Sequence, residues 1–245
     1  MTVSTRKMRG PYPRVVIAIA FAGVAACSPV ATEVGLDGTL TILEPRHDFS
    51  VHRLSDDWLI VGAIKKHPPT VESADNQLHL SLASGGQPYA LIKRLRARLL
   101  ATPFLAWNWS LTGVVSPKHP VQITIGFADT EASGRRLSFR NIFGRKLPAF
   151  SRTLVITWGD SALRRGTLEV RRKGRDGRPA AVYVERGGRE NLGRWWRAAV
   201  DLSALYAKAW PGLDMSKTRI VFAGIVMTAG ARSATAKISA LRLSR

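Results

Sequence analysis

The sequence predicts an all-β protein, a jelly-roll β-sandwich with one or two short helices. Short segments rich in β-branched and aromatic residues recur along the chain, and glycine, proline, aspartate and asparagine separate them. Several of these segments alternate between apolar and polar residues, as strands with one buried face do. So many short strands in a chain of 245 residues favour two packed sheets.

The expected strands follow one another at short intervals. The Asp176-Gly177 pair lies between two of them and predicts a hairpin turn with positive φ. A helix is expected at 202–210, because Pro211-Gly212 follows this segment and stops it. The strands are expected at 39–43, 58–64, 77–83, 89–99, 104–111, 121–127, 153–158, 167–172, 181–186, 219–227 and 236–243.

Two of these strands carry the most informative side chains. Arg94, Arg96 and Arg98 share one face of their strand, and Leu95, Ala97 and Leu99 share the other. The arginines predict a solvated face, and the alternative is a clamp for phosphate or uronate groups. Four apolar residues of the second strand also share a face: Leu105, Trp107, Trp109 and Leu111.

The two tryptophans of this second strand allow two interpretations. The favoured one places them in the core, and then the opposite face, with Asn108, would be a concave ligand surface. The alternative is an aromatic platform that stacks on sugar rings, which requires an indole face open to water.

The first residues predict export and a lipid anchor. Four basic residues precede Val15–Ala26, which carries no charge, and this is the pattern of a secretory signal peptide. The run ends Val24-Ala25-Ala26-Cys27, which resembles the lipobox of bacterial lipoproteins, where diacylglycerol is attached to the cysteine. We therefore expect a signal peptide at 1–26, a lipidated tether at 27–38 and a single β-sandwich domain at 39–245. Because Ser28 follows the cysteine, and not an inner-membrane retention aspartate, we expect the periplasmic side of the outer membrane in a cell with two membranes.

The composition indicates an anionic partner and leaves few covalent stabilisers. Cys27 is the only cysteine, so the mature chain has none for a disulfide or a thiolate metal site. The formal charge is +20 overall, and removal of residues 1–26 leaves thirty-three Lys or Arg against seventeen Asp or Glu. Seventeen of the basic residues lie between Arg135 and Arg197, with five acids. Such a field attracts polyanions and anionic lipids, and export argues against nucleic acid.

Four segments resemble an uncharacterised family of exported bacterial proteins, domain of unknown function 3047. They are Thr102–Trp109, Leu154–Trp158, Asp201–Tyr206 and Gly224–Thr228. The resemblance implies a jelly roll like those of carbohydrate-binding modules. Two residues of these segments, Trp158 and Thr228, join Arg94, Arg96, Arg98 and Asn108 as predicted ligand contacts. The chain departs from the family at 116–119 and 229–232, where acidic loops are usual and this sequence has none.

No segment predicts a catalytic site. Gly159-Asp160-Ser161 is similar to a serine esterase motif, but all five histidines precede Ser161, and a tight turn is the better interpretation. Glu169 and Glu185 flank the predicted hairpin turn and are expected to form exposed ion pairs with nearby arginines, the alternative being a glycosidase pair.

The histidines and aspartates between 47 and 57 do not match a standard metal site. We predict no cofactor and no metal, with a structural calcium at Asp56 or Asp57 as the alternative.

Together these observations favour a membrane-anchored envelope lipoprotein. Its function is expected to be non-catalytic binding of an anionic glycan or lipid headgroup. A structural role in an envelope complex and a polysaccharide hydrolase remain as alternatives.

Overall fold

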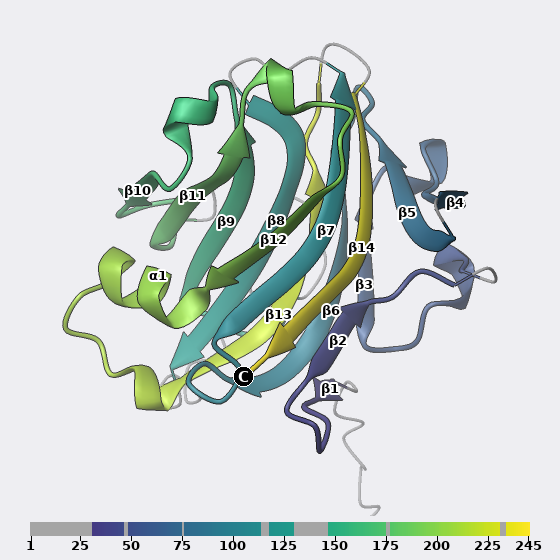
Figure 1. The fold of residues 1–245 in the computed structure, drawn as a ribbon. Helices are drawn as coiled ribbons and strands as arrows, with labels where there is room; N and C mark the ends of the chain where they lie inside the picture. The colour runs from purple at the N-terminus through teal and green to yellow at the C-terminus, as the bar shows by residue number, and fades with distance from the viewer. Residues whose placement is uncertain are drawn as a thin grey trace, which may run out of the picture.

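Two β-sheets pack face to face in a computed structural model of the chain (Figure 1). The structure describes residues 31–46, 49–74, 76–113, 118–129, 147–174, 177–230 and 234–245. The predicted jelly-roll β-sandwich is therefore confirmed, with α1 (Leu202–Ala209) at one end. None of the helices in these described ranges is long and apolar enough to cross a membrane.

The larger sheet has eight strands among the residues described. In spatial order they are β1 (Thr32–Glu33), β6 (Tyr89–Arg98), β13 (Thr218–Met227), β8 (Lys118–Asp129), β9 (Arg152–Gly159), β11 (Ala180–Gly187) and β10 (Leu168–Arg171), while β3 (Trp58–Gly62) also pairs with β6. Most neighbours are antiparallel, but β1 pairs in parallel with β6, and β9 with β11.

The smaller sheet has six strands in the described part of the chain. They are β12 (Trp196–Asp201), β7 (Phe104–Gly113), β14 (Ala234–Ser244), β5 (Gln77–Ala83) and β4 (Thr70–Ala74), with β2 (Leu40–Leu43) paired to β14. Each of these pairs is antiparallel.

The main core lies between the sheets and is built by period-two alternation. On β6, Leu95 and Ala97 are buried while Arg96 and Arg98 are exposed, as predicted. Trp107 and Trp109 of β7 are fully buried with Trp158 of β9. The Trp109 ring lies edge to face on both, with centroids 5.4 Å from Trp107 and 5.5 Å from Trp158. The core interpretation of the β7 tryptophans is therefore confirmed.

The predicted helix and hairpin are also found. α1 begins after Asp201, whose carboxylate accepts a hydrogen bond from the backbone N–H of Ala204 at 3.0 Å and so caps the helix. β10 and β11 form an antiparallel hairpin, and Gly177 in its turn has φ +80°. Asp176 lies outside the described residues.

Three strands were not predicted. β4 and β12 carry mostly small or polar residues between their few apolar ones, so their patterns are weak. β1 lies inside the predicted tether: Thr32 and Glu33 pair with Leu95 and Arg96 of β6. The segment predicted as the tether therefore contains two residues that pair with the sheet.

Candidate functional site

The predicted ligand contacts do not form one site. Arg94, Arg96 and Arg98 lie on the outer face of the eight-stranded sheet, whereas Asn108 lies on the outer face of the six-stranded sheet, opposite the core residues of β7. Two of the arginines have protein partners: Arg94 donates to the Asp56 carbonyl at 2.6 Å, and Arg96 lies 3.5 Å from Glu33. The three arginines and Asn108 therefore do not contact one small ligand together.

Two further predicted contacts have structural roles. Trp158 has no exposed surface and donates its indole N–H to the Gly188 carbonyl at 3.2 Å. Its prediction as a ligand contact is corrected, because its ring lies within the core. Thr228 donates two hydrogen bonds to the Pro120 carbonyl, from its backbone N–H at 2.9 Å and from its hydroxyl at 3.1 Å.

Three residues were considered as catalytic candidates: Ser161, Glu169 and Glu185. Ser161 caps a short 3₁₀ helix, η4 (Ala162–Arg164), which confirms the turn interpretation. Glu169 forms the predicted ion pair, with oxygens 2.8 and 3.1 Å from Arg171. Glu185 also lies near arginines as predicted, with a carboxylate oxygen 3.8 Å from both Arg165 and Arg186. Its predicted exposure is wrong, because the side chain is buried at a bulge in β11. Burial raises the pKa of Glu185.

Asp57, one of the two aspartates considered as calcium ligands, makes contacts within the fold. The Asp57 carboxylate accepts hydrogen bonds from the Thr32 and Ser55 hydroxyls and lies 3.6 Å from Lys93. Burial opposes ionisation here, but these hydrogen bonds outweigh it, and the pKa of Asp57 lies below its usual value. His47 and Asp48 lie outside the described residues, and within those described no three metal-ligating side chains cluster.

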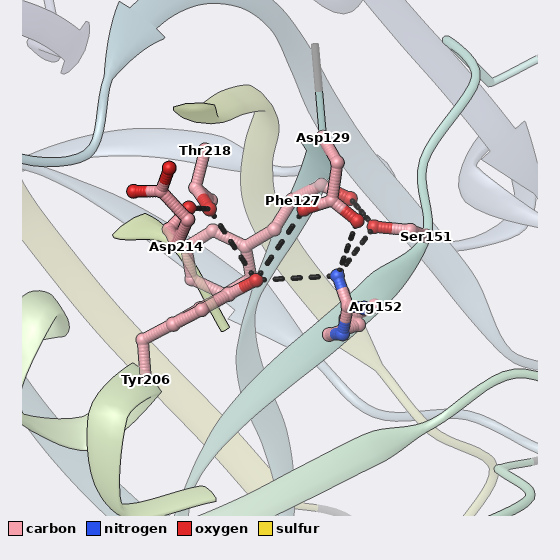
Figure 2. Close-up of polar contacts among 7 residues, drawn as sticks. All are labelled: Phe127, Asp129, Ser151, Arg152, Tyr206, Asp214 and Thr218. Carbon is pink, nitrogen blue, oxygen red and sulfur yellow. Dashed lines mark hydrogen bonds and ion pairs between the residues drawn. The ribbon is translucent and has the colours of Figure 1, made fainter. Parts of the chain in front are cut away.

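A polar network at one end of the sandwich holds α1 against the larger sheet (Figure 2). The Arg152 guanidinium donates to Asp129 at 2.7 Å, to Ser151 at 3.0 Å and to the Tyr206 hydroxyl at 3.2 Å. The Thr218 hydroxyl lies 3.4 Å from the Tyr206 hydroxyl. Tyr206 is buried, and burial raises its pKa. These groups satisfy one another, so the network stabilises the fold.

The most distinctive surface feature is Trp195, at the edge of the six-stranded sheet. It precedes β12, yet its ring contacts His79 of β5 edge to face, with centroids 5.2 Å apart. Because β7 and β14 lie between β12 and β5, the indole must reach across both strands. Ser110 of β7 and Ser239 of β14 face away from the core there, yet both are buried. The indole thus lies over short side chains and still exposes 39% of its own surface.

A buried histidine and an ion pair lie beside this ring. The His79 Nε2 is 3.4 Å from Glu72 Oε2, and Lys237 Nζ is 2.8 Å from the same oxygen. The hydrogen bond from Lys237, with others from Ser81 and His79, lowers the pKa of Glu72 to about 2. Glu72 is therefore a carboxylate throughout the neutral range.

Strand register places further polar groups in the same rows. Arg197 of β12 pairs with Asn108, which pairs with Ser239, and Ser110 pairs with Lys237, which pairs with Ser81. Arg197 is exposed and forms no ion pair with the part of the chain that the structure describes. We call this surface the Trp195 face: Trp195, Arg197, Asn108, Ser110, Lys237, Ser239, His79, Ser81 and Glu72.

The Trp195 face combines three types of contact. The exposed indole offers a flat apolar surface, Arg197 and Lys237 offer cationic donors, and Asn108 offers an amide. Such a surface suits a flat ligand with apolar C–H groups on one side and hydroxyl or acidic groups at its edges.

Sequence reasoning found only Asn108 of this surface. A signal for Trp195 was present in Arg194-Trp195-Trp196-Arg197. Adjacent strand residues point to opposite faces, so two consecutive tryptophans cannot both enter the core. No local pattern places His79 or Glu72 beside them.

Among known proteins, only solved structures are similar to this chain. No family model matches the chain, and neither does any curated protein sequence. Among solved structures, the family GH12 endoglucanase 3 of Trichoderma harzianum is 11% identical with a TM-score of 0.42, over 90% of this chain and 96% of that one. The catalytic domain of Humicola grisea Cel12A is 11% identical with a TM-score of 0.43, over 82% and 92%.

A binding module is also similar. The family 11 carbohydrate-binding module of a Clostridium thermocellum cellulase is 7% identical with a TM-score of 0.38, over 80% of this chain and 91% of the module. Likeness at this level carries no statement about what this chain binds or cleaves.

Proposed function

We propose that this protein is a non-catalytic binding module for an anionic glycan, held at a membrane by a lipid on Cys27. The observation that carries the binding proposal is the half-exposed Trp195 ring laid across the outer face of the six-stranded sheet, with Arg197 and Lys237 beside it. The resemblance to domain 3047, which implies a sandwich of the carbohydrate-binding type, is compatible with this proposal and remains a prediction.

The chemistry favours a sugar chain that carries acidic groups. A pyranose ring presents C–H groups on its flat side, and these stack on an indole. Carboxylate or phosphate groups at the ring edge attract guanidinium and ammonium groups. Lys237 is already paired with Glu72, so Arg197 supplies the available cation. Without residues 1–26, thirty-three basic residues against seventeen acidic ones give a formal charge of +16, which adds long-range attraction for a polyanion.

The ionisation of Glu72 argues against hydrolysis on the Trp195 face. Glycosidases use two carboxyl groups, and the general acid among them has a raised pKa. Glu72 is the only carboxylate that we place on this face, and its pKa is lowered to about 2, so it holds no proton to donate at neutral pH.

Replacing Trp195 by alanine is expected to weaken binding of an acidic polysaccharide by about fivefold or more, because a ring stacked on an aromatic side chain, as measured for nucleobases, contributes about 1–3 kcal/mol. The free energy of unfolding should change by about 1 kcal/mol or less, since the ring lies outside the main core. The measurement is calorimetric titration of the Cys27→Ala protein with polygalacturonate, beside thermal unfolding.

Leu163→Ala is the matched control, because Leu163 is an apolar side chain, 94% exposed, in η4 between β9 and β10 of the other sheet. Arg197→Ala should weaken binding and reduce its dependence on salt. Equal affinity of the Trp195→Ala and wild-type proteins for polygalacturonate would refute the assignment of this face. Binding to anionic phospholipid vesicles without the polysaccharide would point to a headgroup in place of a glycan.

The proposed anchor would hold the sandwich close to the bilayer. Thr32 is paired in β1, and it lies five residues after Cys27. Five residues span at most about 17 Å. The β1–β6 edge, with Arg96 beside Glu33, would therefore lie within that distance of the lipid headgroups.

Mass spectrometry of the protein from its native membrane tests the anchor. We expect a diacyl or triacyl mass at Cys27 and release of the Cys27→Ala variant into the soluble fraction, because several acyl chains bind a bilayer far more firmly than one. An unmodified chain that keeps Met1 would show that the protein is neither exported through this signal nor lipidated at Cys27.

A further inference from the structure

A small pocket opens on the other side of the molecule, on the outer face of the eight-stranded sheet. Its volume is about 170 Å³, and β9, β10, β11 and η4 form its walls. The residues that line it are Thr157, Gly159, Arg164, Thr167, Glu169, Arg171, Val182 and Val184.

The floor of the pocket is apolar apart from one hydroxyl. On β11, Ala181 belongs to the core, so Val182 and Val184 point outward. Thr157 of β9 pairs with Val184 and is 2% exposed. Its hydroxyl makes no hydrogen bond with the described residues. A buried hydroxyl without a partner costs free energy, and a ligand that supplied the partner would recover it. The Thr157 oxygen is closed off from solvent, so a ligand reaches it only when the side chain rotates toward the pocket.

The charges around the pocket are balanced. Arg171 donates two hydrogen bonds to Glu169, at 2.8 and 3.1 Å. Arg164 lies 3.7 Å from Asp160. Each guanidinium therefore already faces a carboxylate, and these residues present no net charge to a ligand. Hydroxyl groups can donate to the carboxylate and accept from the guanidinium, whereas an anion would be repelled by Glu169.

We propose that this pocket binds a single uncharged sugar residue, with Val182 and Val184 against its C–H face and the Thr157 hydroxyl bonded to one of its hydroxyls. Pockets for drug-sized ligands have volumes of about 300–1,000 Å³, so about 170 Å³ suits one ring. The pocket and the Trp195 face lie on opposite sheets, so this site does not depend on the function proposed above.

The Thr157→Val variant tests the site without disturbing the fold. Valine has nearly the shape of threonine, and the hydroxyl that it removes has no partner among the described residues. The variant should unfold at the wild-type temperature or higher, while its affinity for the sugar falls at least about fivefold. Thr124→Val is the control, because Thr124 lies on β8, on the same outer face but outside the pocket lining.

The experiment is a titration of ¹⁵N-labelled Cys27→Ala protein with glucose, galactose, mannose and N-acetylglucosamine, beside glucuronate and glucose 6-phosphate. The proposal expects saturable shifts at the amides of Val182 and Val184 with an uncharged sugar, retained in Thr124→Val and Trp195→Ala. It is overturned if none of the uncharged sugars shifts these amides, if the charged sugars bind more tightly, or if Thr157→Val binds as the wild type does.

Discussion

Replacing Trp158 by alanine is expected to lower the free energy of unfolding by about 3–5 kcal/mol. Trp158 has no exposed surface and lies edge to face on Trp109, with ring centroids 5.5 Å apart. Its removal leaves a cavity between the two sheets and deprives the Gly188 carbonyl of the indole N–H, which donates to it at 3.2 Å. Urea unfolding followed by far-ultraviolet circular dichroism measures the loss.

Two variants show where this loss comes from. Trp158→Phe keeps an aromatic ring but has no N–H. Its free energy of unfolding should therefore lie between those of the wild type and Trp158→Ala. Trp195→Ala removes an equally large side chain from the outer face and should change stability by about 1 kcal/mol or less. Similar losses for Trp158→Ala and Trp195→Ala would contradict the assignment of Trp158 to the core and of Trp195 to the surface.

Acidification from pH 7 to pH 4 is expected to cost about 3 kcal/mol of stability through His119 alone. His119 has no exposed surface. Its Nε2 lies 3.0 Å from the Thr112 carbonyl of β7, and its Nδ1 accepts the backbone N–H of Val121 at 3.2 Å. The ring therefore connects the two sheets in its neutral form.

The direction of this pH dependence follows from the pKa values. Burial lowers the pKa of His119 from 6.5 to about 4, although the hydrogen bond to Thr112 opposes this. The unfolded chain takes up a proton near pH 6.5, whereas the folded chain resists protonation until about pH 4. The stabilisation is thus present above pH 6.5 and is lost as the pH falls toward 4. Glu72, with its pKa lowered to about 2, loses its contribution only below about pH 4.5.

Urea unfolding of the wild type and of His119→Gln at several pH values measures this effect. The variant has no titrating ring at this position, so its stability should vary less between pH 7 and pH 4.5. It will be less stable than the wild type at pH 7, because the amide cannot reproduce both ring contacts. An equal pH dependence in the two proteins would show that His119 is not the group responsible.

Local sequence pattern accounts for most strands of this protein. The alternation in β6 and β7 identified the buried leucines and tryptophans, because successive strand residues point to opposite faces whatever their neighbours are. The Pro211-Gly212 pair marked the end of α1 in the same way. β12 was missed because three of its residues are alanine or arginine, and the apolar period is weak.

The burial of two side chains differs from the prediction. Glu185 was expected to be exposed, but the bulge in β11 shifts the register after Val184, and the carboxylate is buried. Trp158 was expected at a ligand, although its position in an alternating strand with Leu154 and Ile156 already indicated the core. The bulge has no local signature in this sequence, and therefore only the structure showed it.

By itself, the sequence determined the fold class, the positions of most strands and the inner face of β6 and β7. It also carries the basic charge and the expected export signal that precedes Cys27. Only the tertiary structure decided which outer faces meet. Trp195 contacts His79 across β7 and β14, which lie between β12 and β5 in the same sheet. The arginines of β6 lie on the opposite sheet from Asn108. The period of a strand depends on adjacent residues, whereas the order of strands depends on hydrogen bonding between segments far apart in the chain.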